Sequence, residues 1–186
     1  MSSTNKIFFD TDCLSSFLWV GREDIVLDLF PNLIVIPDQV YYELSKVGFL
    51  KTKIDKLIKL KKVSIYSIYF GTKEYDLYLE MTNNPNHSIT KMIIGKGEAS
   101  AIALTITNKN SVLASNNLRD IMPYIRYYSI DYILTEDIMI EAFDKDLITE
   151  TEGNDIWNKM LNKRRRLPYN SFTECLAKHT KKEESN

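Results

Sequence analysis

An uninterrupted apolar run that ends in acidic residues is the feature that most constrains how this chain can fold. Ile7, Phe8 and Phe9 form the run, and Asp10 and Asp12 come immediately after it. A strand without polar alternation is typical of a parallel sheet that is covered on both faces. Open α/β sheets bind their ligands beyond the carboxyl ends of the strands. We therefore expect Asp10 and Asp12 to lie at the edge of the sheet where chemistry takes place.

Segments typical of strands alternate with segments typical of helices along most of the chain. Further strands are predicted at 33–36, 63–66, 111–114 and 128–134. Helices are predicted at 13–20, 24–30, 51–62, 73–81, 98–107, 136–143, 152–161 and 171–177, with one that opens at 37–38 and one after 115–120. This alternation favours a parallel α/β sandwich with a helical C-terminal extension. We predict a main domain over 1–145 and a helical extension over 146–186 that ends in a disordered tail.

The composition is that of a soluble globular protein. Of the 186 residues, 44% are hydrophobic and 26% are charged, which are ordinary proportions. No apolar run approaches the ~20 residues of a membrane span, and nothing like a signal peptide precedes Lys6. Cys13 and Cys175 stand far apart, without the spacing of a zinc site or a disulfide framework. We therefore expect a cytoplasmic protein without a membrane partner.

Two glutamates are expected on the packed side of their helices. Glu43 lies three residues after Val40 and four before Val47, at the flank of an apolar stripe. Glu98 begins an alanine-rich helix, where the positive end of the helix dipole favours a carboxylate. Gly95 and Gly97 precede it and allow a close approach of the backbone at this point.

Carboxylates and carboxamides are thus predicted at the ends of several elements: Asp10, Asp12, Glu43, Glu98, Asn116, Asn117 and Asp120. Several acids at one edge repel one another unless a divalent cation neutralises them. Oxygen ligands suit Mg²⁺ or Mn²⁺, and such an ion can activate water and stabilise charge on a phosphate. The pattern indicates metal-assisted chemistry on a phosphate group.

Three motifs in this order resemble those of the PIN-domain nucleases. Residues 7–14 read Ile-Phe-Phe-Asp-Thr-Asp-Cys-Leu, residues 36–44 read Ile-Pro-Asp-Gln-Val-Tyr-Tyr-Glu-Leu, and residues 95–104 read Gly-Lys-Gly-Glu-Ala-Ser-Ala-Ile-Ala-Leu. The resemblance implies a three-layer α/β/α sandwich with a central parallel sheet, and hydrolysis of RNA at an acidic site that binds Mg²⁺ or Mn²⁺. It places Asp10, Glu43 and Glu98 at the family's acidic positions. Many bacterial members are toxins, so an antitoxin protein and a homodimer are further expected partners.

The fourth motif of the family departs from its usual form. Where an Asp is expected after the strand at 112–114, this chain carries Asn117. An amide oxygen can still face a metal or its water, but it brings no charge, so we expect cations to bind more weakly. Asp120 and Asp12 are the nearby carboxylates that can compensate. The expected metal site is therefore Asp10, Glu98, Asn117, Asp120 and Asp12, with Asp10, Glu43, Glu98 and Asn117 as the catalytic set.

Substrate contacts are expected around this site. Their candidates are Thr11, Ser115, Asn116, Arg119 and Arg126. The basic run at 163–166 is a second candidate surface for RNA, because Arg binds phosphate through forked hydrogen bonds. The lysine-rich helix at 51–62 is better explained as a solvated face.

Two alternatives stay open at this point. One is a binding module on the same fold, in which Asn117 has weakened the metal site and the protein serves an RNA or protein partner. The other is a phosphatase like those of the haloacid dehalogenase superfamily, which also carry Asp-x-Asp after a strand. That second alternative leaves Glu43 and Glu98 without a role. A ribonuclease based on paired histidines is excluded, because His87 and His179 are the two histidines and neither lies in a motif.

Overall fold

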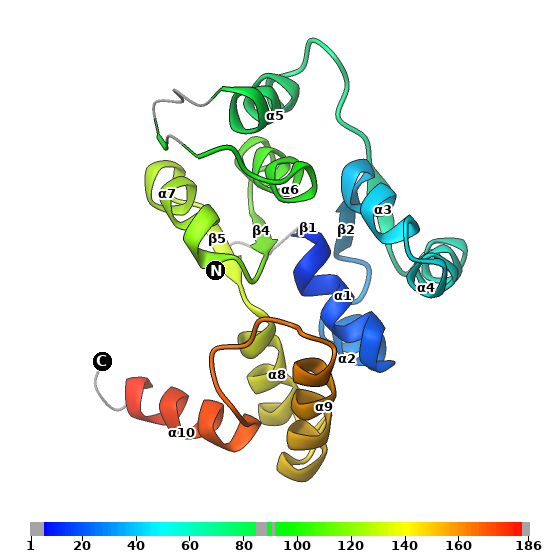
Figure 1. Ribbon diagram of the computed structural model, residues 1–186, viewed down its shortest axis with the longest axis vertical. Coiled ribbons are helices and arrows are strands. Elements are labelled where there is room, and N and C mark those ends of the chain that lie inside the picture. The colour runs from blue at the N-terminus through cyan, green and yellow to red at the C-terminus, as the bar shows by residue number, and fades with distance from the viewer. Residues whose placement is uncertain (1–5, 85–88, 91, 184–186) are drawn as a thin grey trace.

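A parallel sheet forms the centre of the computed structural model, which describes residues 6–84, 89–90 and 92–183 (Figure 1). Within these residues five strands pair in the order β3-β2-β1-β4-β5, and every pair is parallel. The strands are β1 (Lys6–Phe9), β2 (Ile34–Pro37), β3 (Ser64–Tyr66), β4 (Ser111–Ala114) and β5 (Asp131–Ile133). The predicted α/β class with a central parallel sheet is confirmed. His87 lies outside the described residues.

Helices connect and cover the strands. They are α1 (Thr11–Val20), α2 (Glu23–Leu29), α3 (Asp38–Ser45), α4 (Gly48–Lys59), α5 (Lys73–Asn83), α6 (Lys96–Thr107), α7 (Leu118–Tyr128), α8 (Thr135–Asp144), α9 (Glu150–Asn162) and α10 (Phe172–Glu183). Each corresponds to a helix predicted from the sequence, with ends that differ by a few residues. None of the described helices is long and apolar enough to cross a membrane.

The sheet is buried on both faces, as its first apolar run predicts. Ile7 and Phe9 belong to a hydrophobic cluster that includes residues of α1, α2, α8, α9 and α10. Phe8 points to the opposite face and joins a second cluster with residues of α5, α6 and α7, because successive residues of a strand alternate in direction. Figure 1 shows α5, α6 and α7 on one side of the sheet and α1, α2 and α8 on the other. The result is the three-layer sandwich.

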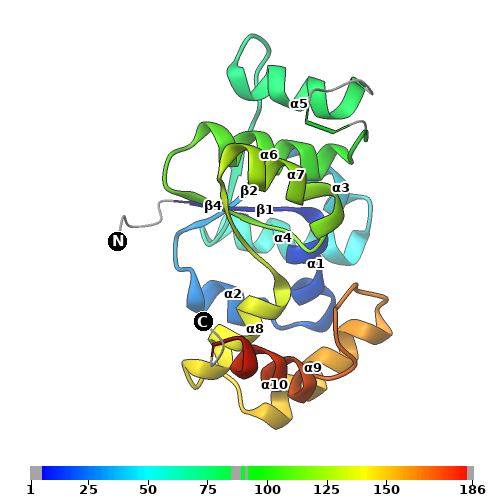
Figure 2. The same cartoon turned by 90° about the vertical axis from the view of Figure 1, so that its left-hand side faces the viewer.

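The order of the strands creates a switch point beside β1. The chain adds β2 and β3 on one side of β1, and then β4 and β5 on the other. The N–H of Asp10 donates to the carbonyl of Ala114 at 2.9 Å, so the ends of β1 and β4 lie together. Ligands of open α/β sheets bind at the carboxyl ends of the strands at such a switch point. Figure 2 shows β1 and β4 side by side, and the hydrogen bond places Asp10 beside the end of β4.

The last strand is shorter than the predicted segment 128–134. Tyr128 belongs to α7, and Ser129 ends that helix in the left-handed region with φ 53°. Tyr128 and Ile130 pack against the hydrophobic cluster on the α6 and α7 side. The apolar residues before Asp131 therefore have a place in the core without belonging to the sheet.

The C-terminal helices share the core of the sandwich. Trp157 of α9 is fully buried in the same cluster as Phe17 of α1. Its Nε1–H donates to the carbonyl of Tyr169 at 2.9 Å, which fixes the loop between α9 and α10. The predicted boundary between 145 and 146 stays a prediction. The sequence predicts a disordered tail over 179–186, but α10 continues as a helix to Glu183, so that prediction is wrong for 179–183. Residues 184–186 lie outside the described part.

Candidate active site

A cleft of about 240 Å³ opens at the switch point between β1 and β4. Its lining residues are Asp10, Thr11, Asp12, Glu43, Gly95, Glu98 and Asn117. The structure thus brings the acids of three separate motifs to one edge of the sheet. Each residue lies at the start of a helix or on its inner face. Asp10 precedes α1, Glu43 lies in α3 and Glu98 lies in α6, and Asn117 lies in the turn between β4 and α7.

Asp10 is the most deeply buried of these acids, with 3% of its surface exposed. Its Oδ1 accepts the backbone N–H of Cys13 at 2.7 Å and so caps helix α1. Burial raises the pKa of Asp10 to about 7, because the charged form loses its hydration. Hydrogen bonds from Ser115 and Cys13 lower this pKa, whereas the charges of Asp12 and Glu43 raise it. Asp10 is a carboxylate held where it needs a positive partner.

Glu98 lies across the cleft in the first turn of α6. Burial, together with the neighbouring charges of Asp10 and Asp120, raises its pKa to about 8. Its Oε2 accepts a long hydrogen bond from Nδ2 of Asn117 at 3.4 Å. Its Oε1 is buried and has no hydrogen-bond partner among the residues that the structure describes. A buried carboxylate oxygen without a partner is costly, so Oε1 is the atom of this cleft that would gain most from a bound cation.

Glu43 connects three elements. One carboxylate oxygen accepts the hydroxyl of Thr11, and the other accepts the backbone N–H of Gly97 at 3.0 Å. A Cβ at position 97 would lie 2.5 Å from Oε2 of Glu43 and 2.9 Å from Oγ1 of Thr11. The close approach predicted for the glycine-rich segment is therefore made to Glu43 and Thr11. Glu43 holds the starts of α1 and α6 at the cleft, and Thr11 is engaged in that contact.

Asn117 lies between two carboxylates at the start of α7. Its Nδ2 donates to Oδ2 of Asp120 at 2.7 Å and to Glu98 at 3.4 Å. Its backbone N–H donates to the hydroxyl of Ser115 at 3.3 Å, and Ser115 is fully buried. The amide thus bridges Glu98 and Asp120, where an Asp at this position would add a third negative charge. Asp120 contacts Asn117 but is not one of the residues that line the cleft.

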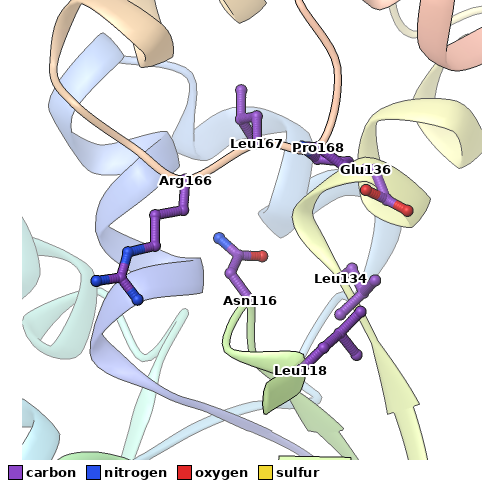
Figure 3. Close-up of a pocket in the computed structure, with 7 residues that line it drawn as sticks. All are labelled: Asn116, Leu118, Leu134, Glu136, Arg166, Leu167 and Pro168. Atoms are coloured by element: carbon purple, nitrogen blue, oxygen red, sulfur yellow. The ribbon is translucent and has the colours of Figure 1, made fainter. Parts of the chain in front are cut away.

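Three candidate substrate residues lie elsewhere. Oδ1 of Asn116 accepts the backbone N–H of Thr135 at 2.9 Å, at the start of α8. Asn116 therefore faces a neighbouring pocket, drawn in Figure 3. Arg119 and Arg126 are exposed on α7, and neither lines the acidic cleft. Their role in binding substrate stays a prediction.

One contact at the rim of the cleft joins two segments that are far apart in the sequence. Nη1 of Arg165 donates to Oδ1 of Asp12 at 3.3 Å and to the hydroxyl of Ser15 at 3.2 Å. The loop between α9 and α10 therefore reaches the edge of the cleft. The basic run at 163–166 was the signal for it, but its partner lies 153 residues away in the sequence.

The cleft fits a hydrated hard cation better than an ion enclosed by protein ligands. Across residues 6–84, 89–90 and 92–183, no three or more His, Cys, Asp or Glu side chains are grouped closely enough to hold a metal ion. The donors are nevertheless oxygens, and the raised pKa values of Asp10 and Glu98 show two buried acids that lack a compensating charge. Mg²⁺ usually keeps several of its waters and binds through one or two carboxylates. Asp10 and Glu98, with its unpartnered Oε1, are the residues that would hold it.

Comparison with known proteins identifies the family of this chain. A family model described as a PIN domain matches residues 6–181, nearly the whole chain. No curated protein matches the chain.

Proposed function

The chain belongs to the PIN-domain family, whose members are generally nucleases, and on that premise we propose that it is a metal-dependent endoribonuclease. The observation that carries the proposal is the buried, unpartnered Oε1 of Glu98 in a cleft that it shares with Asp10. Two acids whose ionisation is opposed by burial are what a cation-dependent hydrolase needs. RNA in the cytoplasm is the proposed substrate.

Each polar residue of the cleft has a distinct part in this proposal. Asp10 and Glu98 bind the ion directly or through its waters, with Asp12, Asn117 and Asp120 around them. Glu43 is a positioning residue, because both of its oxygens are engaged by Thr11 and Gly97. When bound, Mg²⁺ or Mn²⁺ supplies an activated water and neutralises charge on the phosphate. The burial of Asp10 keeps bulk water from competing for its carboxylate.

The biological setting is also part of the proposal. The resemblance to bacterial toxins supports a role as the toxin of a toxin–antitoxin pair, with an antitoxin protein as partner and a homodimer as the assembled form. Co-expression with the product of the neighbouring reading frame tests the first point, because an antitoxin would relieve growth inhibition. Sedimentation of the purified protein tests the second.

A binding module is the second candidate, and Asn117 is the observation that favours it. The amide adds no negative charge to the site, and its Nδ2 donates hydrogen bonds to Asp120 and Glu98. Such a protein would bind RNA without cutting it. The phosphatase alternative is not favoured. It leaves Glu43 and Glu98 without a role, although both lie in one cleft with Asp10.

Cleavage of a mixed RNA pool tests the proposal. The purified protein is incubated with Mn²⁺, Mg²⁺ or EDTA, together with the Asp10→Asn variant. Asp28→Asn is the matched control, because Asp28 is exposed on α2. Cleavage that needs the metal, persists in Asp28→Asn and disappears in Asp10→Asn supports the nuclease. RNA binding without cleavage under every metal condition would favour the binding module.

A further inference from the structure

A second pocket lies beside the acidic cleft, and the two are joined through neighbouring residues. It has a volume of about 220 Å³. Asn116 lines this pocket and Asn117 lines the cleft. The Cα atoms of adjacent residues are about 3.8 Å apart, so the pocket and the cleft share the turn after β4 as part of their walls.

Four of the seven residues that line this pocket are apolar, and they come from three parts of the fold. They are Leu118 at the start of α7, Leu134 before α8, and Leu167 and Pro168 of the loop between α9 and α10 (Figure 3). The hydrogen bond from Trp157 to Tyr169 holds this loop in place. Apolar walls with a few polar groups are typical of pockets that bind organic ligands. The small volume suits one flat ring system.

Asn116 offers the pocket a hydrogen-bond donor of known orientation. The N–H of Thr135 can only donate, so the atom of Asn116 that accepts it at 2.9 Å is the oxygen Oδ1. Nδ2 is therefore the other end of the amide, and Figure 3 shows it directed towards Arg166 and Leu167. An acceptor atom on the edge of a ring in the pocket can bind there.

Two charged residues of opposite sign, Arg166 and Glu136, also line the pocket, and Arg166 is the one that can bind a phosphate. Arg166 lines the pocket, but its guanidinium is directed away from the other labelled residues in Figure 3. An exposed arginine beside an apolar pocket can bind a backbone phosphate while the base is buried. Proteins that read single-stranded RNA take up unstacked bases in this way, with one face covered and one edge hydrogen-bonded.

We propose that this pocket binds one unstacked base of the RNA, next to the phosphate that lies in the acidic cleft. The inference rests on the proposed ribonuclease function and adds the part of the substrate that the enzyme reads. Asn116 donates to the edge of the base, the leucines and Pro168 cover its faces, and Arg166 contacts the strand.

The test uses nucleoside 5′-monophosphates and ribose 5-phosphate, which lacks the base. Their binding to ¹⁵N-labelled protein is followed by NMR, with the backbone amides of Leu134 and Leu167 as reporters, because both line the pocket and are present in every variant. Leu118→Trp fills the pocket, and Leu147→Trp is its matched control, because the two leucines are 38% and 39% exposed. Asn116→Asp is the second variant, since its carboxylate still accepts the N–H of Thr135 but cannot donate to the base.

At least one nucleotide is expected to bind about tenfold more tightly than ribose 5-phosphate. Leu118→Trp is expected to remove this difference, Asn116→Asp to reduce it about threefold to tenfold, and Leu147→Trp to leave it unchanged. Equal binding of ribose 5-phosphate and all four nucleotides would overturn the pocket. So would wild-type nucleotide affinity in both pocket variants. If Leu118→Trp does not fold, Asn116→Asp decides.

Cleavage of RNA by the same proteins separates this inference from the proposed function. Nucleotide binding in the pocket without any RNA cleavage by the wild type would refute the nuclease and leave the base site standing. Metal-dependent cleavage without a preference for nucleotides over ribose 5-phosphate would refute the base site and leave the nuclease. If both hold, Leu118→Trp raises KM for short oligonucleotides more than it lowers kcat.

Discussion

The backbone N–H of Gly97 donates to Oε1 of Glu43 at 3.0 Å, across 54 residues of sequence. This contact places the start of α6, and with it Glu98, against the end of α3. No side chain fits between them, because a Cβ at position 97 would lie 2.5 Å from the second oxygen of Glu43. The geometry of the acidic cleft therefore depends on a glycine that does not itself line the cleft.

Gly97→Ala is expected to displace Glu43 and reduce metal-dependent RNA cleavage by tenfold or more. The new methyl group forces Glu43 away from Thr11 and from the N–H of residue 97, which costs about 1–3 kcal/mol of stability as overpacking. Cleavage rate and the free energy of unfolding in urea are the measurements. The loss of activity should exceed what the loss of folded protein explains, because the displaced residue positions the site.

Gly48→Ala is the control for this substitution. A Cβ at Gly48 meets nothing within 4 Å, and the residue is the first of helix α4. Replacing it should leave activity unchanged and stabilise the fold by at most about 1 kcal/mol, through a less flexible unfolded chain. Equal activity in Gly97→Ala and Gly48→Ala would show that Glu43 does not need its present position.

The stability of the metal-free protein is expected to fall as the pH rises from about 4 to about 8. The folded pKa of Asp10 is raised from 3.8 to about 7, and that of Glu98 from 4.5 to about 8. For an acid with a raised folded pKa, the stabilising contribution is complete below the ordinary pKa and is lost as the pH passes the folded pKa. Melting temperatures in EDTA across this range are the measurement.

Asp10→Asn isolates the contribution of Asp10 to this pH dependence. The amide does not ionise, so the variant should lose less stability between low and high pH than the wild type. Adding Mg²⁺ near pH 8 should restore part of the wild-type stability, because a cation favours the charged carboxylates. Identical pH profiles for the wild type and Asp10→Asn would contradict the conclusion that burial raises the pKa of Asp10.

Gly153→Ala is expected to loosen α10 from α9. A Cβ at Gly153 would lie 2.2 Å from the ring of Phe172, and both residues belong to the buried surface between these helices. We expect a loss of about 1–3 kcal/mol in denaturant unfolding, with a single transition. A separate early transition would instead indicate that the C-terminal helices unfold as an independent unit.

The sequence was sufficient for the residues whose environment is set locally. The apolar run 7–9 was sufficient to predict a buried strand. Asp10 is the next residue, so its place at the carboxyl end of that strand could be predicted as well. The spacing of Glu43 from Val40 and the helix start at Glu98 agree with the place of both acids in the cleft. Val47, the other end of the stripe expected around Glu43, lies after α3 and is 37% exposed. Parallel strands then bring these ends to one edge of the sheet. That edge could be predicted without knowing the order of the strands.

The remaining contacts depend on long-range packing that no local pattern encodes. Gly97 meets Glu43 only because α3 and α6 pack together, and Arg165 meets Asp12 only because the loop after α9 folds back across α1. Asn116 and Asn117 are adjacent and chemically identical, yet the turn after β4 sends their side chains into different cavities. Tyr128 is predicted to begin a strand but is the last residue of helix α7. Its packing against the core, which no local pattern encodes, is the reason for this difference.

Asn117→Asp is expected to increase affinity for Mn²⁺ about tenfold and to raise the rate of RNA cleavage, because a carboxylate replaces an amide beside Glu98. Without metal the same change should destabilise the fold, since the donor to Asp120 is lost and three acids then face one another. Calorimetry with Mn²⁺ and melting in EDTA measure the two effects, which should have opposite signs.

Asn83→Asp, at an exposed asparagine of α5, is the control and should change neither the affinity for Mn²⁺ nor the stability without metal. Tighter metal binding without any cleavage would mean that the native chain uses this cleft to bind RNA. Unchanged metal affinity would place the cation away from residue 117.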